Sequence, residues 1–99
     1  MELSAYLQMM EGGIYKILPL WEEQQSGGNV HLDVYIPTLV DELIGAQRSF
    51  PELGRDPSYI AIINTVQYMI DHEMTHAECR RKVFRMLRLL NQMEGDAHV

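Results

Sequence analysis

The sequence lacks the features that mark secreted and membrane-spanning proteins. Cys79 is its only cysteine, so no intrachain disulfide can form and nothing indicates an oxidising compartment. No apolar run approaches the ~18 residues of a membrane-spanning helix, and no charged segment followed by an apolar segment opens the chain. We therefore expect a cytoplasmic protein that does not enter a membrane.

Basic residues are also scarce, and most of them lie together. The chain has 8 Lys and Arg against 14 Asp and Glu, for a net charge of −6. Residues 1–79 carry twelve acids and three bases, whereas residues 80–88 carry five bases and no acid. An acidic body repels nucleic acid and anionic membranes, so nucleic-acid binding is disfavoured as a general function. The basic segment can still meet an acidic protein, including a second copy of this chain.

Motifs of the common enzyme and nucleic-acid-binding classes are missing too. The sequence has no helix-turn-helix glycine, no RNP-type aromatics and no phosphate-cradling glycine loop. No serine or cysteine nucleophile stands out, and we expect Cys79 to be an ordinary buried thiol. The 99 residues and their 46% hydrophobic content suit a single domain covering residues 1–99.

Hydrophobic spacing predicts an all-α protein, specifically an antiparallel four-helix bundle. Gly12-Gly13 and Pro19 are expected to break or kink the first helix, and Asp56 followed by Pro57 is a helix start signal. Gly95 is expected to stop the last helix and leave a frayed tail. The predicted helices span residues 2–24, 33–48, 57–71 and 75–93. The predicted core includes Leu18, Trp21, Leu39, Leu43, Ile62, Val66, Met69, Val83, Leu87 and Leu90.

One stretch also allows a different fold class. Residues 30–36 alternate apolar and polar side chains, so they could form a strand that pairs with residues 14–20. The protein would then be α+β, with a hairpin at residues 14–36. A longer helical stripe through Leu39 and Leu43 favours the helix instead. In that helix Asp33 would be the N-cap, which places Pro37 in the first turn.

The segment between the last two predicted helices contains a literal His-Glu-x-x-His, at His72, Glu73 and His76. On one helix, residues i and i+4 share a face and can bind one Zn²⁺. The stretch resembles the signature of the zincin metallopeptidases. That resemblance implies a zinc-dependent hydrolase with His72 and His76 as metal ligands and Glu73 as the general base.

Three observations argue against this zinc site. A catalytic zinc needs a third protein ligand, and the remaining candidates (Glu94, Asp96 and His98) lie far along the chain from His76. Thr75 and Glu78 fit a capping box, which would start a new helix inside the motif. The apolar faces before and after the motif also do not align on one continuous helix. We therefore predict that the chain reverses direction between residues 70 and 76 and that the protein has no metal cofactor.

The last predicted helix is amphipathic from Arg80 onward. Apolar residues share one arc, and Arg81, Arg85 and Arg88 share the opposite one. Guanidinium groups at i, i+4 and i+7 can meet carboxylates or phosphates. We therefore predict a non-catalytic interaction or regulatory protein that binds a protein partner through these arginines, and that partner could be a second copy in a homodimer. The alternatives are the zinc-dependent hydrolase and a nucleic-acid accessory protein that uses the basic helix at residues 80–88.

Overall fold

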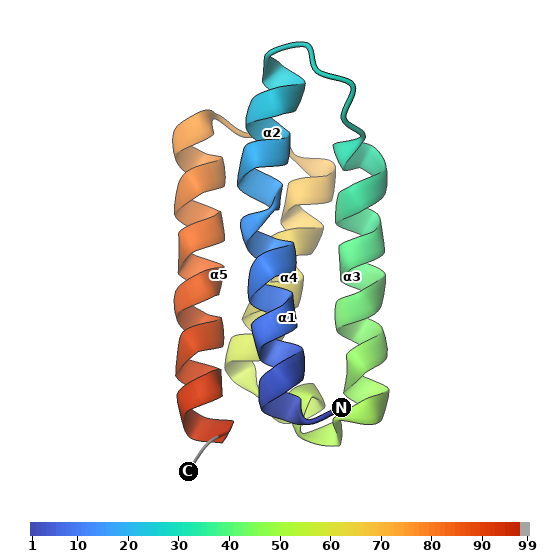
Figure 1. Cartoon of the computed structure of the whole chain (residues 1–99), viewed down its shortest axis with the longest axis vertical. Coiled ribbons are helices and arrows are strands. Elements are labelled where there is room, and N and C mark those ends of the chain that lie inside the picture. The colour runs from blue at the N-terminus through green and yellow to red at the C-terminus, as the bar shows by residue number, and fades with distance from the viewer. Residues whose placement is uncertain (98–99) are drawn as a thin grey trace.

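The computed structural model describes residues 1–97, and all its regular structure is helical (Figure 1). The expected all-α class is therefore confirmed, and the alternative hairpin at residues 14–36 is wrong. A strand would have buried Val34 together with Leu32 and Ile36, but the helix buries the latter two and leaves Val34 61% exposed. The helices are α1 (Leu3–Tyr15), α2 (Ile17–Gln25), α3 (Leu32–Ser49), the short 3-10 helix η1 (Pro51–Arg55), α4 (Pro57–Asp71) and α5 (His76–Ala97).

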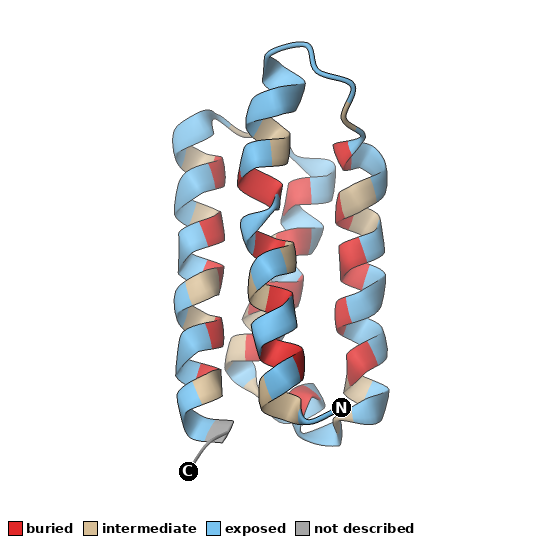
Figure 2. Ribbon diagram, viewed as in Figure 1, coloured by how far each residue is buried: buried red, intermediate tan, exposed pale blue. Residues whose placement is uncertain are grey.

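The helices form a four-rod bundle in which successive rods run in opposite directions. α1 and α2 stack end to end as one rod, and α3, α4 and α5 are the other three (Figure 1). α5 packs against α1, α2 and α4, while α3 packs against α2 and α4. Figure 2 shows buried residues along the inward side of every rod. The bundle predicted from hydrophobic spacing is thus confirmed in its topology.

The start of α4 follows the predicted signal. The Asp56 carboxylate accepts hydrogen bonds from the backbone N–H groups of Ser58 (2.8 Å) and Tyr59 (3.3 Å). Pro57 occupies the first helical turn, where a missing N–H costs little. This start places Tyr59 in the centre of the core, where its hydroxyl donates to the Leu43 carbonyl at 2.5 Å.

The first rod is interrupted at Lys16 and not at the glycine pair. α1 continues through Gly12 and Gly13, and the Lys16 N–H still bonds to the Gly12 carbonyl at 3.1 Å. Pro19 has no N–H to offer the carbonyl of Tyr15, four residues earlier, so one helical hydrogen bond is lost. The predicted break within residues 2–24 is therefore present, and it lies beside the proline and not at the glycine pair.

α3 begins one residue earlier than predicted, and Asp33 is not its N-cap. Leu32 is the first helical residue, and its N–H is satisfied by the side-chain carbonyl of Gln24 on α2 at 3.3 Å. Asp33 lies in the first turn, and Pro37 falls in the second turn instead of the first. The contact with Gln24 of α2 therefore helps to set the start of α3 at Leu32, whereas the local cap signal at Asp33 predicted a later start.

α5 runs through Gly95, so the predicted stop there is wrong. Asp96 and Ala97 extend the helix, and the rest of the predicted frayed tail, residues 98–99, lies outside the described residues. Trp21 and Leu87, both predicted as core, are only partly buried but pack against the core. The other eight predicted core residues are buried: Leu18, Leu39, Leu43, Ile62, Val66, Met69, Val83 and Leu90.

Candidate functional site

The His-Glu-x-x-His residues lie on the connection between α4 and α5. α4 ends at Asp71, and His72 has extended backbone angles (φ −129°, ψ 133°). His76 is the first residue of α5. The predicted reversal of the chain is confirmed, so the two imidazoles do not share a helical turn as the zincin signature requires.

The new helix starts with the predicted capping box. The Glu78 N–H donates to the Thr75 hydroxyl at 3.2 Å, and the Thr75 N–H donates to a Glu78 carboxylate oxygen at 3.3 Å. Each side chain thus satisfies a backbone N–H that has no partner within the helix. This reciprocal pair fixes the helix boundary inside the motif.

The two histidines contact different parts of the bundle. The His72 ring stacks on Tyr68, with ring centroids 3.8 Å apart, and its Nδ1 lies 3.0 Å from the Tyr68 carbonyl. Because a carbonyl only accepts, the proton of this bond belongs to Nδ1. The His76 side chain contacts α2 and not α4: its Nε2 lies 2.8 Å from a Glu22 carboxylate oxygen. The Trp21 ring is 5.6 Å from the His76 ring, so α2 holds this histidine on two sides.

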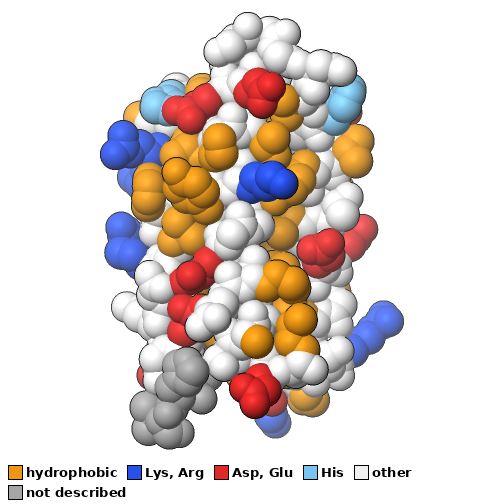
Figure 3. All heavy atoms as spheres, viewed as in Figure 1, with side chains coloured by type: hydrophobic (Ala, Val, Ile, Leu, Met, Phe, Trp, Pro, Cys, Tyr) orange, Lys and Arg blue, Asp and Glu red, His pale blue; other side chains and the backbone are white. Residues whose placement is uncertain are grey.

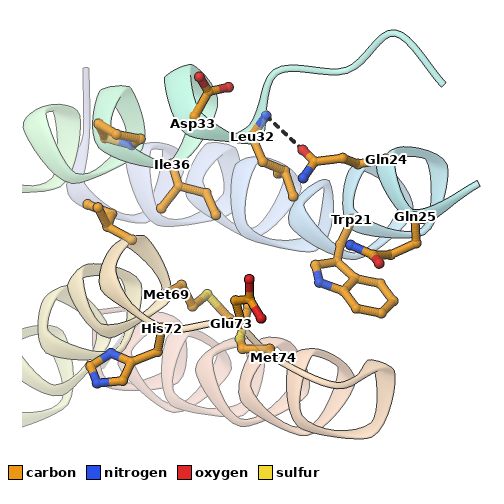
Figure 4. Close-up of a pocket in the computed structure, with 12 residues that line it drawn as sticks. Trp21, Gln24, Gln25, Leu32, Asp33, Ile36, Met69, His72, Glu73 and Met74 are labelled. Carbon is orange, nitrogen blue, oxygen red and sulfur yellow. Dashed lines mark hydrogen bonds between the residues drawn. The ribbon is translucent and has the colours of Figure 1, made fainter. Parts of the chain in front are cut away.

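Glu73 lines a cleft of about 410 Å³ between α2, α3 and the connection after α4. Figure 4 shows its carboxylate pointing toward α2 and α3, while the His72 ring lies on the side of α4. Trp21, Leu32 and Met74 form apolar walls. Asp33, Gln24 and Gln25 also line the cleft, so its surface is mixed polar and apolar, and Glu73 and His72 do not converge on one point.

The remaining candidate zinc ligands do not lie near this cleft. Within residues 1–97, no group of three or more His, Cys, Asp or Glu side chains is placed to hold a metal ion. Glu94 and Asp96 lie on α5, and Glu94 is about 27 Å from His76 along the helix at 1.5 Å per residue. His98 lies outside the described residues.

We expect protein purified without a histidine tag to contain less than one zinc per ten chains, because the motif is split between two elements. His72→Ala is expected to leave that content unchanged, and metal analysis by atomic emission measures both. Stoichiometric zinc that disappears in His72→Ala would show that the imidazoles act together despite the break.

The three predicted partner-binding arginines lie on the outer face of α5. Arg81, Arg85 and Arg88 are all exposed, opposite the buried residues of the helix. Figure 3 shows basic side chains along the upper part of α5 and acidic ones on the opposite edge, over α3. Within residues 1–97, no carboxylate lies within ion-pairing distance of any of the three guanidinium groups. They are therefore brought together on one face, and none of them has a carboxylate partner among residues 1–97.

The other two cations of the basic segment contact aromatic rings. The Arg80 guanidinium lies 5.7 Å from the Phe84 ring centroid, and the Lys82 ammonium lies 4.4 Å from that of Tyr68 on α4. Phe84 is 37% exposed beside the arginine face. Sequence reasoning missed Phe84, although its position outside the apolar arc of α5 was a signal that it would face solvent.

Three exposed acidic residues of α2 and α3 do not reach these arginines. Glu22 lies against His76, and Asp41 and Glu42 are exposed on α3, which lies on the far side of α1 (Figure 1). Like charges spaced i, i+4 on a helix destabilise it by about 0.2–0.5 kcal/mol per pair. This repulsion is therefore not relieved by an ion pair among the described residues.

Cys79 is fully buried on the inner face of α5. Burial, and secondarily the charge of Glu22, raises the pKa of the Cys79 thiol to about 11 from its ordinary value of 9.0. The thiolate is the reactive form, so this environment makes the cysteine inert. The expectation of an ordinary buried thiol is confirmed.

We expect the thiol of the native protein not to react with a chromogenic disulfide reagent at pH 8, and one thiol per chain to react in denaturant.

Burial of Cys79 also predicts a pH dependence of stability. As pH rises from 9 to 11, the unfolded chain loses the thiol proton before the folded chain does, so the free energy of unfolding falls by up to about 1.4 kcal/mol per pH unit. Urea titrations at pH 8 and pH 10 measure this fall. Cys79→Ala should reduce the slope, and an identical slope in that variant would contradict the assignment.

Comparisons of the chain with protein-family models, curated proteins and solved structures give no match. No helix within residues 1–97 has both the length and the apolar character needed to cross a bilayer.

Proposed function

We propose that this protein is a non-catalytic interaction protein that binds an acidic protein surface through the outer face of α5. Arg81, Arg85 and Arg88 supply the cations of this surface, and Phe84 supplies an apolar anchor beside them. A second copy of the chain is one such acidic partner, since the net charge is −6.

The observation that carries the proposal is three exposed guanidinium groups on one helix with no carboxylate partner in the described chain. A guanidinium presents a planar fork that matches a carboxylate with two parallel hydrogen bonds. The spacing along α5 puts successive arginines on the same face, so an acidic helix or strand can meet them together. Arginine and aromatic residues are also the side chains most enriched at energetically important interface positions.

The geometry supports the two alternative functions less well. A zinc hydrolase would need both imidazoles on one helix, whereas α4 ends before the motif and α5 starts at its last residue. A nucleic-acid accessory protein would need a basic surface broad enough to follow phosphates. Here the basic stripe is confined to one helix of an acidic protein, which disfavours long-range attraction to polyanions.

Binding to a fluorescein-labelled, glutamate-rich helical peptide tests this function. The variant Arg81→Glu, Arg85→Glu, Arg88→Glu is expected to bind the peptide at least about tenfold more weakly, because it removes every direct charge contact. The chain offers a matched control in its three bases outside α5. The variant Lys16→Glu, Arg48→Glu, Arg55→Glu has the same net charge and should bind almost as tightly as the native protein.

Equal losses in the two variants would show that only overall charge matters and would contradict the proposal. The same titration with single-stranded RNA and duplex DNA separates the nucleic-acid alternative. Binding to either that exceeds peptide binding, with a salt dependence reduced in Arg81→Ala and Arg85→Ala, would favour that alternative instead.

A further inference from the structure

The bundle has an open side between α1 and α3. α1 packs against α5 and α3 packs against α4, and a groove of about 580 Å³ lies between the two. The Tyr35 hydroxyl donates to the carbonyl of Gly13, a lining residue, at 2.5 Å and bridges the two helices at the groove. Its lining residues include Met1, Met9, Met10, Glu42, Gly45 and Phe50.

The groove is apolar and adaptable. Met9 is 51% exposed and Met1 is 80% exposed, so their flexible thioethers stand at its edge. Tyr6 and Phe50 meet with ring centroids 5.5 Å apart and form part of its floor. Methionine side chains reshape around an apolar partner at little cost. Glu42 has the only charged side chain in the lining, and Met1 contributes the N-terminal ammonium.

Gly45 keeps the groove open although the fold does not require a glycine there. It lies in the interior of α3, and a Cβ at this position would meet no atom within 4 Å. A glycine inside a helix costs about 0.5–1 kcal/mol relative to alanine. Steric crowding within the chain therefore does not require Gly45, and a large side chain at this lining position would take up space in the groove.

The chemistry of the groove suits an apolar side chain with a cation beside it. The apolar side chain would pack against the walls of the groove, and the cation would pair with Glu42. Among the exposed large apolar side chains of the described residues, Phe84 is the one that lies among unpaired arginines. Arg81 and Arg88 are one helical turn from it on either side. The chain thus carries both halves of a complementary pair.

We propose that the groove between α1 and α3 receives the outer face of α5 from a second copy of the chain. Phe84 of one copy lies among the methionines of the other, and an arginine beside it pairs with Glu42. This inference rests on the proposed function and names the acidic partner as the chain itself.

The two surfaces lie on different sides of the molecule, since α5 and α3 form opposite edges of the view in Figure 1. The contact therefore joins copies head to tail, and every open assembly keeps one free groove and one free α5 face, whereas a closed ring keeps neither. The native protein is expected to form species larger than a dimer as its concentration rises. This outcome differs from a closed homodimer, in which the same patch of both copies is used.

Sedimentation velocity on mixtures of two variants tests the contact. Gly45→Leu fills the groove and leaves α5 intact, whereas the Arg81→Glu, Arg85→Glu, Arg88→Glu variant leaves the groove intact. Each variant alone is expected to be a monomer at concentrations where the native protein associates. An equimolar mixture contains one intact groove and one intact α5 face per pair, so it should form a 1:1 complex and nothing larger.

Matched controls separate the groove from general effects. Gly12→Leu makes the same change at another helical glycine with open space around it, outside the groove, and should associate like the native protein. Glu42→Lys should weaken association by about tenfold or more, whereas Asp41→Lys, an equal change in charge outside the lining, should not. These two exposed substitutions also keep the test valid if Gly45→Leu alters the fold.

A mixture that stays monomeric while the native protein associates would overturn the inference, and so would native protein that remains a monomer at millimolar concentration. If the glutamate-rich peptide still binds α5 in either case, the proposed function stands and the partner is another protein. If the peptide does not bind either, both proposals fall.

Discussion

Leu43→Ala is expected to lower the free energy of unfolding by about 2–5 kcal/mol. Leu43 is fully buried in the middle of α3, which packs against α4. Its removal leaves a cavity in the core, and the hydrogen bond from the Tyr59 hydroxyl to the Leu43 carbonyl limits how far Tyr59 can shift to fill it. A domain of this size has about 5–15 kcal/mol of stability in total, so the melting temperature should fall by about 10 °C or more.

Ile44→Ala is the matched control for this change. Ile44 is the next residue of α3 and is 42% exposed, so its truncation should cost less than about 1 kcal/mol. Urea titrations of both variants measure the difference. Equal losses would mean that α3 is not oriented as described, since the two side chains point to opposite sides of the helix.

Pro37→Ala is expected to stabilise the protein by up to about 3 kcal/mol. Pro37 lies in the second turn of α3, where the Asp33 carbonyl lacks the N–H that residue 37 would normally donate. Alanine restores this hydrogen bond and removes the clash of the proline ring with the preceding turn. Part of the gain is offset because alanine makes the unfolded chain more flexible.

Pro57→Ala should act in the opposite direction. Pro57 occupies the first turn of α4 behind the Asp56 cap, where no N–H is needed. Its replacement only adds flexibility to the unfolded chain and should cost about 0.4–1 kcal/mol. Thermal unfolding of the two variants gives the signs directly. A destabilised Pro37→Ala protein would place Pro37 in a first turn, as the sequence had suggested.

Local signals predicted the parts of the fold that depend on residues close in sequence. The Asp56-Pro57 start and the Thr75–Glu78 capping box both form with the side-chain bonds expected of them. The capping box falls inside the His-Glu-x-x-His motif, so the sequence was sufficient to reject one continuous helix through it.

Features that depend on contacts between helices were not predictable in the same way. The start of α3 depends on Gln24, which reaches Leu32 from α2. The groove depends on how far α1 lies from α3, which no helical pattern encodes. The sequence placed Arg81 on the outer face of α5. It could not show that Glu22 contacts His76, or that no carboxylate within residues 1–97 pairs with Arg81, Arg85 or Arg88.

A single nuclear magnetic resonance titration tests the binding face most directly. Protein labelled with ¹⁵N is mixed with the glutamate-rich helical peptide, and the arginine Nε–H and backbone amide signals are followed. The largest shifts are expected at Arg81, Phe84, Arg85 and Arg88, and they should shrink as salt is added. Shifts that are largest at Lys16, Arg48 and Arg55, or that spare α5 altogether, would contradict the assignment of the outer face of α5 as the binding surface.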